Sequence, residues 1–514
     1  MDNNEKKKGG LLGSAALMGI IILLSKVLGL FRDTLVANFY GTSMESVAYT
    51  AASKLPVTIF DLVIGGVVSA AFIPVFNSVL VKKGKGEAMK FANAYVNLII
   101  IICTVIAVIG IVFAAPLIGF IAPDIPADAA ALAVKLTRIM FPMIIFTGLA
   151  FSFVGILQSM GEYNLPALIS LVSNSIMVAY LFTLNRFFGI VGLAVAMLLG
   201  WAAQAFIQVP KAHSLAFRYS VKANLFDPDI YRAAKNALPI LIGTWTTPIC
   251  NLINTRLASG IDNGRAITAL DYANRLYTMI VGVFSFVATN LLFPYFSRAE
   301  ASGDREGASR MMRTSVKTLI YIIAPIAVGV MVLSEPFTAI VYQRGEFTAS
   351  DTVITAEALS RYAVGMIFMA ANEVIVKALF AASKPKIPMV SSIASMVFNI
   401  VLVTVFGEKL GIGGIALVSA FATVVNLTIN LIMAHRTGVC RFALRDVVDI
   451  MVSVVCACAM IPAIIAVSGL AVSAILKVAL SVAAAVPVYF VSSLILRSEE
   501  AKFIVAPIVR KLNK

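Results

Sequence analysis

The sequence predicts an all-α, polytopic membrane protein with 14 transmembrane helices, arranged as two six-helix lobes plus two extra C-terminal helices. Three observations predict this class. Hydrophobic residues make up 60% of the 514 residues, and charged residues make up only 13%. Apolar runs long enough to cross a bilayer as a helix recur along the whole chain. Segments of the first half also resemble segments of the second half at one nearly constant offset.

The apolar runs mark the expected transmembrane helices. Several are longer than the ~20 residues that a helix needs to cross a bilayer, so we expect those helices to tilt or to extend beyond it. The expected spans are 11–40, 46–81, 88–120, 130–160, 165–184, 188–210, 228–258, 264–298, 306–334, 351–382, 387–406, 412–434, 446–468 and 471–496.

Lysine and arginine gather in alternate loops, and this pattern predicts the orientation of the chain. Basic loops include 82–90, 211–235 and the tail from Arg497, whereas the loop at 122–130 is acidic and rich in proline. Because cytoplasmic loops carry the excess of Lys and Arg, we expect both termini in the cytoplasm. Membrane topology therefore explains the net charge of +15, and we expect no nucleic-acid partner.

Four pairs of segments repeat, with proline, glycine and arginine in step. The pairs are KLPVTIFDLVIGGVVSAAFIPVF (54–76) with RLYTMIVGVFSFVATNLLFPYF (275–296), LTRIMFPMI (136–144) with LSRYAVGMI (359–367), LPALIS (165–170) with IPMVSS (387–392), and GIVGLA (189–194) with GIGGIA (411–416). Each copy holds six helices. An even number keeps both copies in the same orientation, so a pseudo-two-fold axis along the membrane normal should relate them.

The repeat predicts four parts of the chain. We expect an N-terminal lobe at 1–210, a cytoplasmic linker at 211–227, a C-terminal lobe at 228–436, and the last two helices with a cytoplasmic tail at 437–514. A substrate site would lie between the lobes near the middle of the bilayer, and the lobes would rock against each other.

The first span contains the charges that we expect to matter most. Lys26, Arg32 and Asp33 lie in the middle of it, where a charge costs roughly 2.5 to 3.5 kcal/mol on insertion scales. Such residues normally face a wet cavity or a partner, and Gly29 can let the helix bend between them. Alternatively, Arg32 and Asp33 extend to the headgroups. The favoured interpretation is a water-filled, cationic cavity inside the bilayer.

Lys54 and Arg275 occupy equivalent positions of the repeat, so we expect them to face each other across the lobe interface. Arginine offers a fork that suits two phosphate oxygens, and lysine acts as a point charge. An anionic substrate with a phosphate or pyrophosphate group is the natural partner. Alternatively, these cations only neutralise internal carboxylates, for which Asp33 and Asp61 are candidates. Asp61 follows Lys54 by seven residues and shares its helix face.

Nothing in the sequence predicts catalysis. The two histidines, His213 and His435, stand in loops without a nucleophile or a metal-ligand cluster beside them. Most of the five cysteines fall in apolar runs, which predicts neither a disulfide framework nor a zinc site. We therefore expect no catalytic residue, no metal and no cofactor, and the protein should not be an enzyme.

Several motifs together resemble the MurJ family of lipid II flippases, also called the mouse virulence factor family. This family belongs to the multidrug/oligosaccharidyl-lipid/polysaccharide exporter superfamily. The motifs are SKVLGLFRDTLVANFYG (25–41), KLP (54–56), GGVVSAAFIPVF (65–76), DYANRLYTMIVGVF (271–284) and YQRGEFT (342–348). The resemblance implies two six-helix lobes around a V-shaped cationic cavity, with two extra helices that form a groove for the lipid tail.

The resemblance also implies roles for single residues. Lys26 and Arg32 stand at the first-helix cations of the family, and Asp33 matches the acid of its RD pair. Lys54 matches the lysine of KLP, and Arg275 matches the arginine of the eighth-helix motif.

The chain departs from the family pattern at other positions. Phe60 and Asp61 stand where the family commonly has an arginine, and Asn274 stands where an acid often precedes the arginine. Asn254 occupies a position that can be acidic in relatives, where an acid would bear on sodium coupling.

The expected function is that of a lipid II flippase in the bacterial inner membrane. It would move the undecaprenyl-pyrophosphate-linked peptidoglycan precursor to the outer leaflet by alternating access, and so serve cell-wall synthesis and cell shape. Membrane lipids and other cell-wall synthesis proteins are the further partners expected. Two alternatives remain open, a flippase for another polyprenyl-linked glycan and a drug/cation antiporter of the same superfamily. The antiporter should expose carboxylates in its cavity, whereas Lys and Arg dominate here.

The loop pattern predicts the outcome of a labelling experiment. A single cysteine at Ile125 of an otherwise cysteine-free variant should react with a membrane-impermeant maleimide in intact spheroplasts, because loop 121–130 is expected outside. A cysteine at Lys85 should react only after permeabilisation. Labelling at position 125 only after permeabilisation would exclude this topology.

Overall fold

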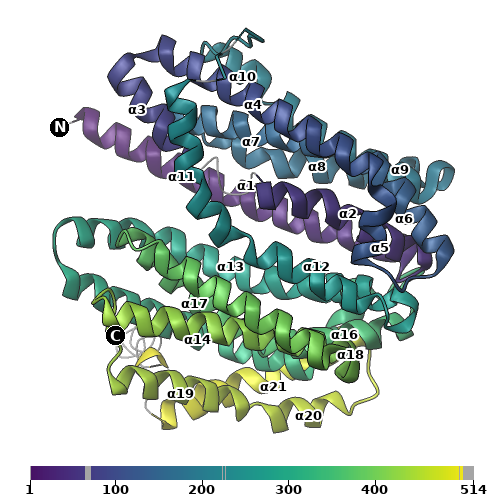
Figure 1. Cartoon of the computed structure of the whole chain (residues 1–514). Helices are drawn as coiled ribbons and strands as arrows, with labels where there is room; N and C mark the ends of the chain where they lie inside the picture. The colour runs from purple at the N-terminus through teal and green to yellow at the C-terminus, as the bar shows by residue number, and fades with distance from the viewer. Residues whose placement is uncertain (1, 64–70, 223, 226, 497, 502–514) are drawn as a thin grey trace. The chain divides into compact units, whose positions relative to one another are not determined.

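The computed structural model describes residues 2–63, 71–222, 224–225, 227–496 and 498–501, and the regular elements in these ranges are helices, with no strand among them. The helices up to the linker are α1 (Asp2–Tyr40), α2 (Met44–Val63), α3 (Ile73–Lys83), α4 (Lys85–Val112), α5 (Ala114–Ile121), α6 (Ala127–Met140), α7 (Met143–Ser159), α8 (Asn164–Thr183), α9 (Asn185–Phe206) and α10 (Val209–Ser214) (Figure 1).

The remaining helices complete the chain. They are α11 (Pro228–Thr244), α12 (Thr246–Ala258), the 3-10 turn η2 (Asp262–Gly264), α13 (Arg265–Ala301), α14 (Arg305–Val332), α15 (Ser334–Tyr342), α16 (Ala349–Ala363), α17 (Met366–Ala381), α18 (Lys386–Arg436), α19 (Leu444–Cys458), α20 (Ile461–Ser468) and α21 (Ala474–Ile495).

The hydropathy of these helices identifies a multi-pass membrane protein. Within the described residues, nine helical segments are long and apolar enough to cross a bilayer. A tenth results if α16 and α17, which meet at an angle of 48°, are counted as one broken span.

Where the structure describes the chain without a gap, five of the predicted spans are each broken into two helices. At three of these breaks a proline stands in the first turn of the second helix, and at a fourth a proline immediately precedes the second helix. Proline has no N–H to donate to the preceding turn, and its ring clashes with that turn, so a continuous helix stops there. The four prolines are Pro116, Pro142, Pro248 and Pro462. At the fifth break, between α16 and α17, the chain passes through Gly365.

Two glycines at equivalent positions of the repeat share an unusual backbone conformation. Gly189 has φ 53° and ψ −145° inside α9, and Gly411 has φ 65° and ψ −158° inside α18. This region of conformational space is essentially restricted to glycine. At Gly411 the long helix α18 divides into two candidate spans. The local backbone therefore repeats together with the sequence.

The chain divides by its contacts into two compact units, Met1–Ile267 and Thr268–Lys514. Helices α11 and α12, which the sequence repeat assigns to its second copy, pack in the first unit against α2 and its neighbours. The segment that precedes them is also held there. Asn93 Nδ2 donates to the carbonyl oxygen of Arg218 over 2.8 Å, and Asn97 Nδ2 donates to that of Ser220 over 2.8 Å. Contacts and the repeat thus divide the chain at different places.

A buried ion cluster connects three parts of the second unit. Lys317 of α14 is 8% exposed. Its Nζ lies 2.9 Å from Asp449 and 3.6 Å from Asp446, both in α19. The same atom lies 3.2 Å from Glu499 and 3.8 Å from Glu500, which follow α21. The last two predicted spans are therefore attached to α14 through one ammonium group.

This geometry predicts that Lys317→Met destabilises the protein strongly. Removal of one partner from a buried ion pair leaves uncompensated charge and costs roughly 3–5 kcal/mol. Arg310→Met on the same helix is the matched control, because the Arg310–Glu306 pair is exposed and should contribute less than about 1 kcal/mol. Thermal unfolding midpoints of the two purified variants would show the difference. Equal midpoints would contradict this account of the cluster.

Candidate substrate site

Arg32 is held between its own helix and α8. Its Nε and Nη2 donate to Asp33 Oδ1 over 3.0 and 2.7 Å, and its Nη1 donates to Asn174 Oδ1 over 2.8 Å. Asn174 in turn donates to the carbonyl oxygen of Ser25 over 3.3 Å. Asp33 therefore neutralises Arg32, the role in which internal carboxylates were considered as partners of the cations. The Arg32 side chain still keeps 21% of its surface exposed.

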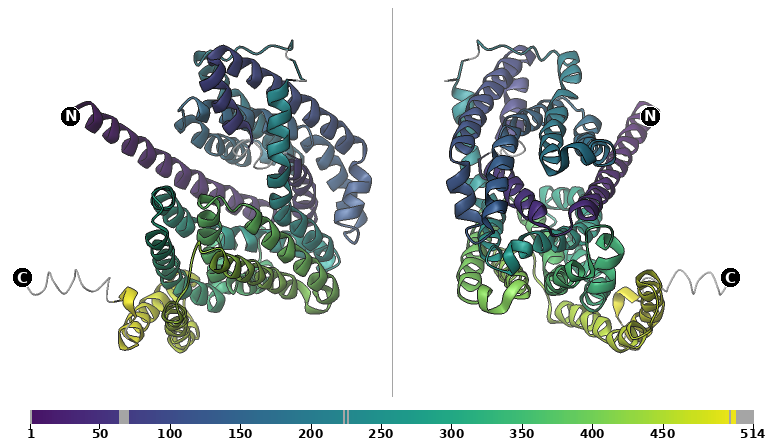
Figure 2. Two further views of the ribbon diagram at one scale, coloured as in Figure 1. Left: turned by 60° about the vertical axis from the view of Figure 1, so that its left-hand side comes forward. Right: turned by 90° about the vertical axis from the view of Figure 1, so that its right-hand side faces the viewer.

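Gly29 allows this close approach of α1 and α8. A Cβ atom at position 29 would lie 3.3 Å from Nδ2 of Asn174. Helix α1 continues through Gly29 without a break, and Figure 2 shows it as one long helix. Because Gly29 has no side chain, Asn174 can approach α1 closely enough to form its hydrogen bonds.

Lys26 differs from Arg32 in having no fixed partner. It is half-buried, and it forms no hydrogen bond or ion pair with any residue in the described part of the chain. A lone ammonium group on an apolar helix favours an anion, because burial without a partner is costly. Of the first-helix cations, Lys26 is the one whose charge no described carboxylate compensates.

Lys54 connects α2 to α12 within the first unit. Its Nζ donates to Thr255 Oγ1 over 3.2 Å, and Thr255 is itself buried. Asp61 forms no hydrogen bond or ion pair with the described residues, so the suggested pairing with Lys54 is wrong. Seven residues separate the two along the helix by about 10 Å, too far for direct contact.

Arg275 has an internal partner one turn earlier on α13, in the second unit. Its Nε donates to Asp271 Oδ2 over 2.8 Å, and its side chain is 41% exposed. Asn274 is half-buried beside it, and its backbone carbonyl accepts a bond from Thr278 Oγ1. Asp271 is a further residue of this site, and the i, i+4 spacing in DYANR is the sequence signal for its pair with Arg275.

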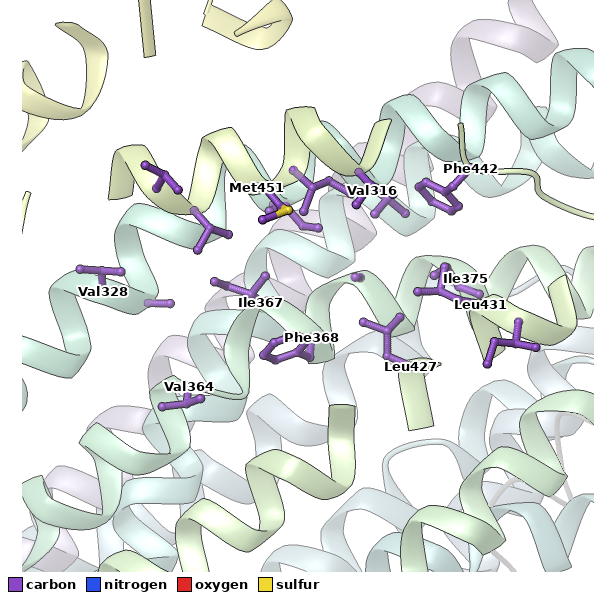
Figure 3. A pocket seen from close by; sticks show the side chains of 18 of the residues that line it. Val316, Val328, Val364, Ile367, Phe368, Ile375, Leu427, Leu431, Phe442 and Met451 are labelled. Carbon is purple, nitrogen blue, oxygen red and sulfur yellow. The ribbon is translucent and has the colours of Figure 1, made fainter. Parts of the chain in front are cut away.

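An apolar groove of about 830 Å³ lies within the second unit. Helices α14, α17, α18 and α19 contribute most of its walls, and Figure 3 shows their side chains pointing into it. The wall residues include Val316, Val328, Phe368, Leu427 and Met451. Such a surface can accommodate hydrocarbon chains. Its position beside α19 agrees with the expected groove next to the two extra helices.

Other kinds of site find little support. No group of three His, Cys, Asp or Glu side chains suited to a metal occurs among the described residues. All five cysteines are free thiols. Within the described residues, the candidate features are thus the cations on α1, α2 and α13 and the apolar groove of the second unit.

Comparison with known proteins identifies relatives along most of the chain. The sequence model of the family described as lipid II flippase MurJ matches residues 36–491. A probable lipid II flippase MurJ of Bdellovibrio bacteriovorus is 28% identical over 444 residues, which cover 85% of this chain and 84% of the relative. One from Vibrio cholerae is 26% identical over 451 residues, covering 85% of each.

Solved structures share the fold. A lipid II flippase MurJ in an inward closed conformation superposes with a TM-score of 0.81 at 22% identity, covering 96% of this chain and 100% of that one. A multidrug resistance MATE transporter in an inward-facing conformation gives a TM-score of 0.66 at 14% identity, with 82% and 98% covered.

The close approach at Gly29 leads to a test. Gly29→Leu should separate α1 from α8, because overpacking typically costs about 1–3 kcal/mol, and it should weaken the bond from Arg32 to Asn174. Gly19→Leu on the same helix is the control, since a Cβ atom there meets nothing within 4 Å. Unfolding midpoints and transport should both fall for Gly29→Leu alone. Equal behaviour of the two variants would show that Gly29 does not set this packing.

Proposed function

Because this chain belongs to the lipid II flippase MurJ family, we propose that it moves lipid II from the inner to the outer leaflet of the bacterial cytoplasmic membrane. The observation that carries the proposal is the family match over residues 36–491, which includes Lys54, Arg275 and the groove. Flipping makes and breaks no covalent bond, so the protein would be a transporter and not an enzyme. It would supply a precursor for peptidoglycan, and other cell-wall synthesis proteins would be its partners.

The pyrophosphate of lipid II would bind at Lys26, Arg32, Lys54 and Arg275, with Asp33 and Asn274 in support. A guanidinium group has five N–H donors, and the bonds to Asp33 and Asn174 use three of those of Arg32. Two donors remain for phosphate oxygens. Lys26 would add a charge that no described carboxylate compensates. The internal partners would thus keep the cations oriented while the site is empty.

The polyprenyl tail would occupy the groove of the second unit. Its walls are almost entirely aliphatic and aromatic, so a hydrocarbon chain loses nothing by leaving lipid for it. The headgroup and the tail would therefore have separate environments during transport. This division suits a substrate that is polar at one end and apolar over most of its length.

The proposed architecture has 14 transmembrane helices in two six-helix lobes, 1–210 and 228–436, followed by the extra pair in 437–514, with both termini in the cytoplasm. The shared conformation of Gly189 and Gly411 supports this repeat. The lobes would rock to expose the site to one leaflet and then to the other.

Two other functions would use similar features. A flippase for another polyprenyl-linked glycan would also need cations and an apolar groove, and only the substrate separates it from the present proposal. A drug/cation antiporter shares the fold, as the MATE likeness illustrates, but 14% identity supports the fold alone. The family match favours lipid II.

We expect Arg32→Ala and Arg275→Ala each to reduce flipping at least about tenfold, since charge-assisted hydrogen bonds contribute roughly 1.5–3 kcal/mol. Arg→Lys should restore only part of the activity, because the bidentate fork is lost. The measurement is growth and lipid II accumulation in cells depleted of their own flippase. Arg186→Ala is the control, because this exposed arginine lies over the Phe187 ring. Normal growth with both variants at native expression would exclude the cationic site.

A further inference from the structure

Two buried asparagines hold the segment between α10 and α11 against α4. Asn93 Nδ2 donates to the carbonyl oxygen of Arg218 over 2.8 Å, and Asn93 Oδ1 accepts from the backbone N–H of Ser220 over 2.8 Å. Asn97 Nδ2 donates to the carbonyl oxygens of Ser220 and Val221 over 2.8 and 3.3 Å. The backbone of this segment is therefore fixed to a helix that is long and apolar enough to cross a bilayer.

The side chains of the same segment are exposed. Its start is anchored by Phe217, which is buried and packs edge-to-face against Phe153. The residues that follow, RYSVK (218–222), are all exposed, and Tyr219 and Val221 leave 54% and 77% of their surface uncovered. Apolar side chains that a fixed backbone holds outside the protein indicate a surface that contacts another molecule. We call residues 218–222 the RYSVK segment.

The two cations of the RYSVK segment have no internal partner. Neither Arg218 nor Lys222 forms a side-chain hydrogen bond or an ion pair within the described ranges of the chain. Asp229 at the start of α11 lies 2.8 Å from Lys83 Nζ and 3.6 Å from Arg232 Nη1, so its charge is already compensated. The charges of Arg218 and Lys222 are therefore available to an anion from outside.

The place where the segment crosses α4 is level with the lipid headgroups. This helix has 28 residues and is about 42 Å long at about 1.5 Å per residue. It exceeds the ~30 Å hydrocarbon core of a bilayer, so one end extends beyond the core. Its first turns carry Lys85, Glu87 and Lys90, whereas its exposed large apolar side chains begin at Ile101. The two asparagines lie between these regions, at the boundary of the bilayer.

The internal repeat supports this position. RYSVK (218–222) corresponds to RFALR (441–445), at the same offset as the pair LTRIMFPMI and LSRYAVGMI. Leu444, the equivalent of Val221, is 82% exposed and is the first residue of a helical segment that can cross a bilayer. The second copy thus places the equivalent motif where a span begins.

The two copies of this motif differ in how their last cation is used. Arg445 in the second copy donates to Glu499 of the ion cluster. Its equivalent Lys222 forms no such bond with a described residue. The second copy therefore serves the internal packing of its unit, whereas the first copy keeps both cations for an external partner.

We propose that the RYSVK segment binds the headgroup of an anionic glycerophospholipid of the surrounding bilayer. The guanidinium group of Arg218 would bind two phosphate oxygens through its fork, and Lys222 would add a point charge. Tyr219 would lie at the level of the headgroups with its hydroxyl in water, and Val221 would contact the start of the acyl chains. This inference goes beyond the proposed function, because it requires neither lipid II nor transport.

Charge and position together select this occupant. An acidic protein would satisfy the two cations, but it would not account for a segment held at the boundary of the bilayer. Free phosphate would leave Tyr219 and Val221 in contact with water. An anionic lipid satisfies the cations and the apolar side chains at once, because basic residues near a membrane surface attract anionic lipids.

Photo-crosslinking tests the site directly. The full-length protein carries p-benzoylphenylalanine in place of Tyr219, which keeps an aromatic ring at this position. It is irradiated in nanodiscs that hold equal amounts of phosphatidylglycerol and phosphatidylcholine, and mass spectrometry counts the adducts of each lipid. The three backgrounds are the otherwise unchanged protein, the double variant Arg218→Gln, Lys222→Gln, and the double variant Lys384→Gln, Lys386→Gln. The last is the matched control, because it removes the same charge from another exposed loop.

We expect adducts of phosphatidylglycerol to exceed those of phosphatidylcholine at least about fivefold, the effect of one basic residue near an anionic lipid surface. The excess should disappear in the Arg218, Lys222 variant and persist in the Lys384, Lys386 variant. An unchanged excess without Arg218 and Lys222 would overturn the proposal. So would an equal loss in both double variants, because only the total charge would then matter, and so would the absence of any lipid adduct in the unchanged protein.

Two further arms identify the source of the anion. Excess inorganic phosphate should leave the adducts unchanged, and their loss would overturn the choice of a bilayer lipid. Irradiation of intact cells should again give phospholipid adducts, whereas an adduct with a protein in their place would overturn the proposal in favour of an acidic protein partner. Failure of the intact protein to replace a cell's own flippase would remove the proposed function and leave this result unaffected.

Discussion

The cost of placing charge inside an apolar environment governs this structure. A cation at membrane depth persists only if a carboxylate, a polar side chain or a ligand compensates it. Arg32 uses Asp33 and Asn174, Arg275 uses Asp271, and both keep part of the guanidinium exposed. These cations are thus compensated within the fold, while their side chains are not fully buried.

The second unit separates apolar from ionic contacts around α14. One set of its residues, from Val316 to Met331, faces the groove, while Lys317 lies within the ion cluster. The cluster attaches α19 and the segment after α21 to α14, and α19 forms one wall of the groove. Ion pairs fix this wall at one end. Apolar side chains, which would fill the groove, are not needed to hold it there. The ionic contacts thus hold α19 beside α14, where it forms one wall of the groove.

The two copies of the internal repeat share even single backbone angles, but the repeat does not determine which helices pack together. Gly189 and Gly411 adopt the same glycine-only conformation because both helices turn at equivalent points. Helices α11 and α12 nevertheless pack in the first unit, where Thr255 accepts a bond from Lys54. Equivalent sequences therefore adopt equivalent local structure, whereas the tertiary fold determines which helices pack against each other.

The sequence by itself determined the helical membrane class, the repeat, and the cations Lys26, Arg32, Lys54 and Arg275. These features follow from hydropathy and from spacing along the chain, which are local properties. The tertiary structure alone decided which groups compensate the cations, since Asn174 and Thr255 stand far along the chain from Arg32 and Lys54. It also decided the groove, whose walls come mainly from four helices. Such features arise only where helices distant in sequence come together, and hydropathy carries no record of that contact.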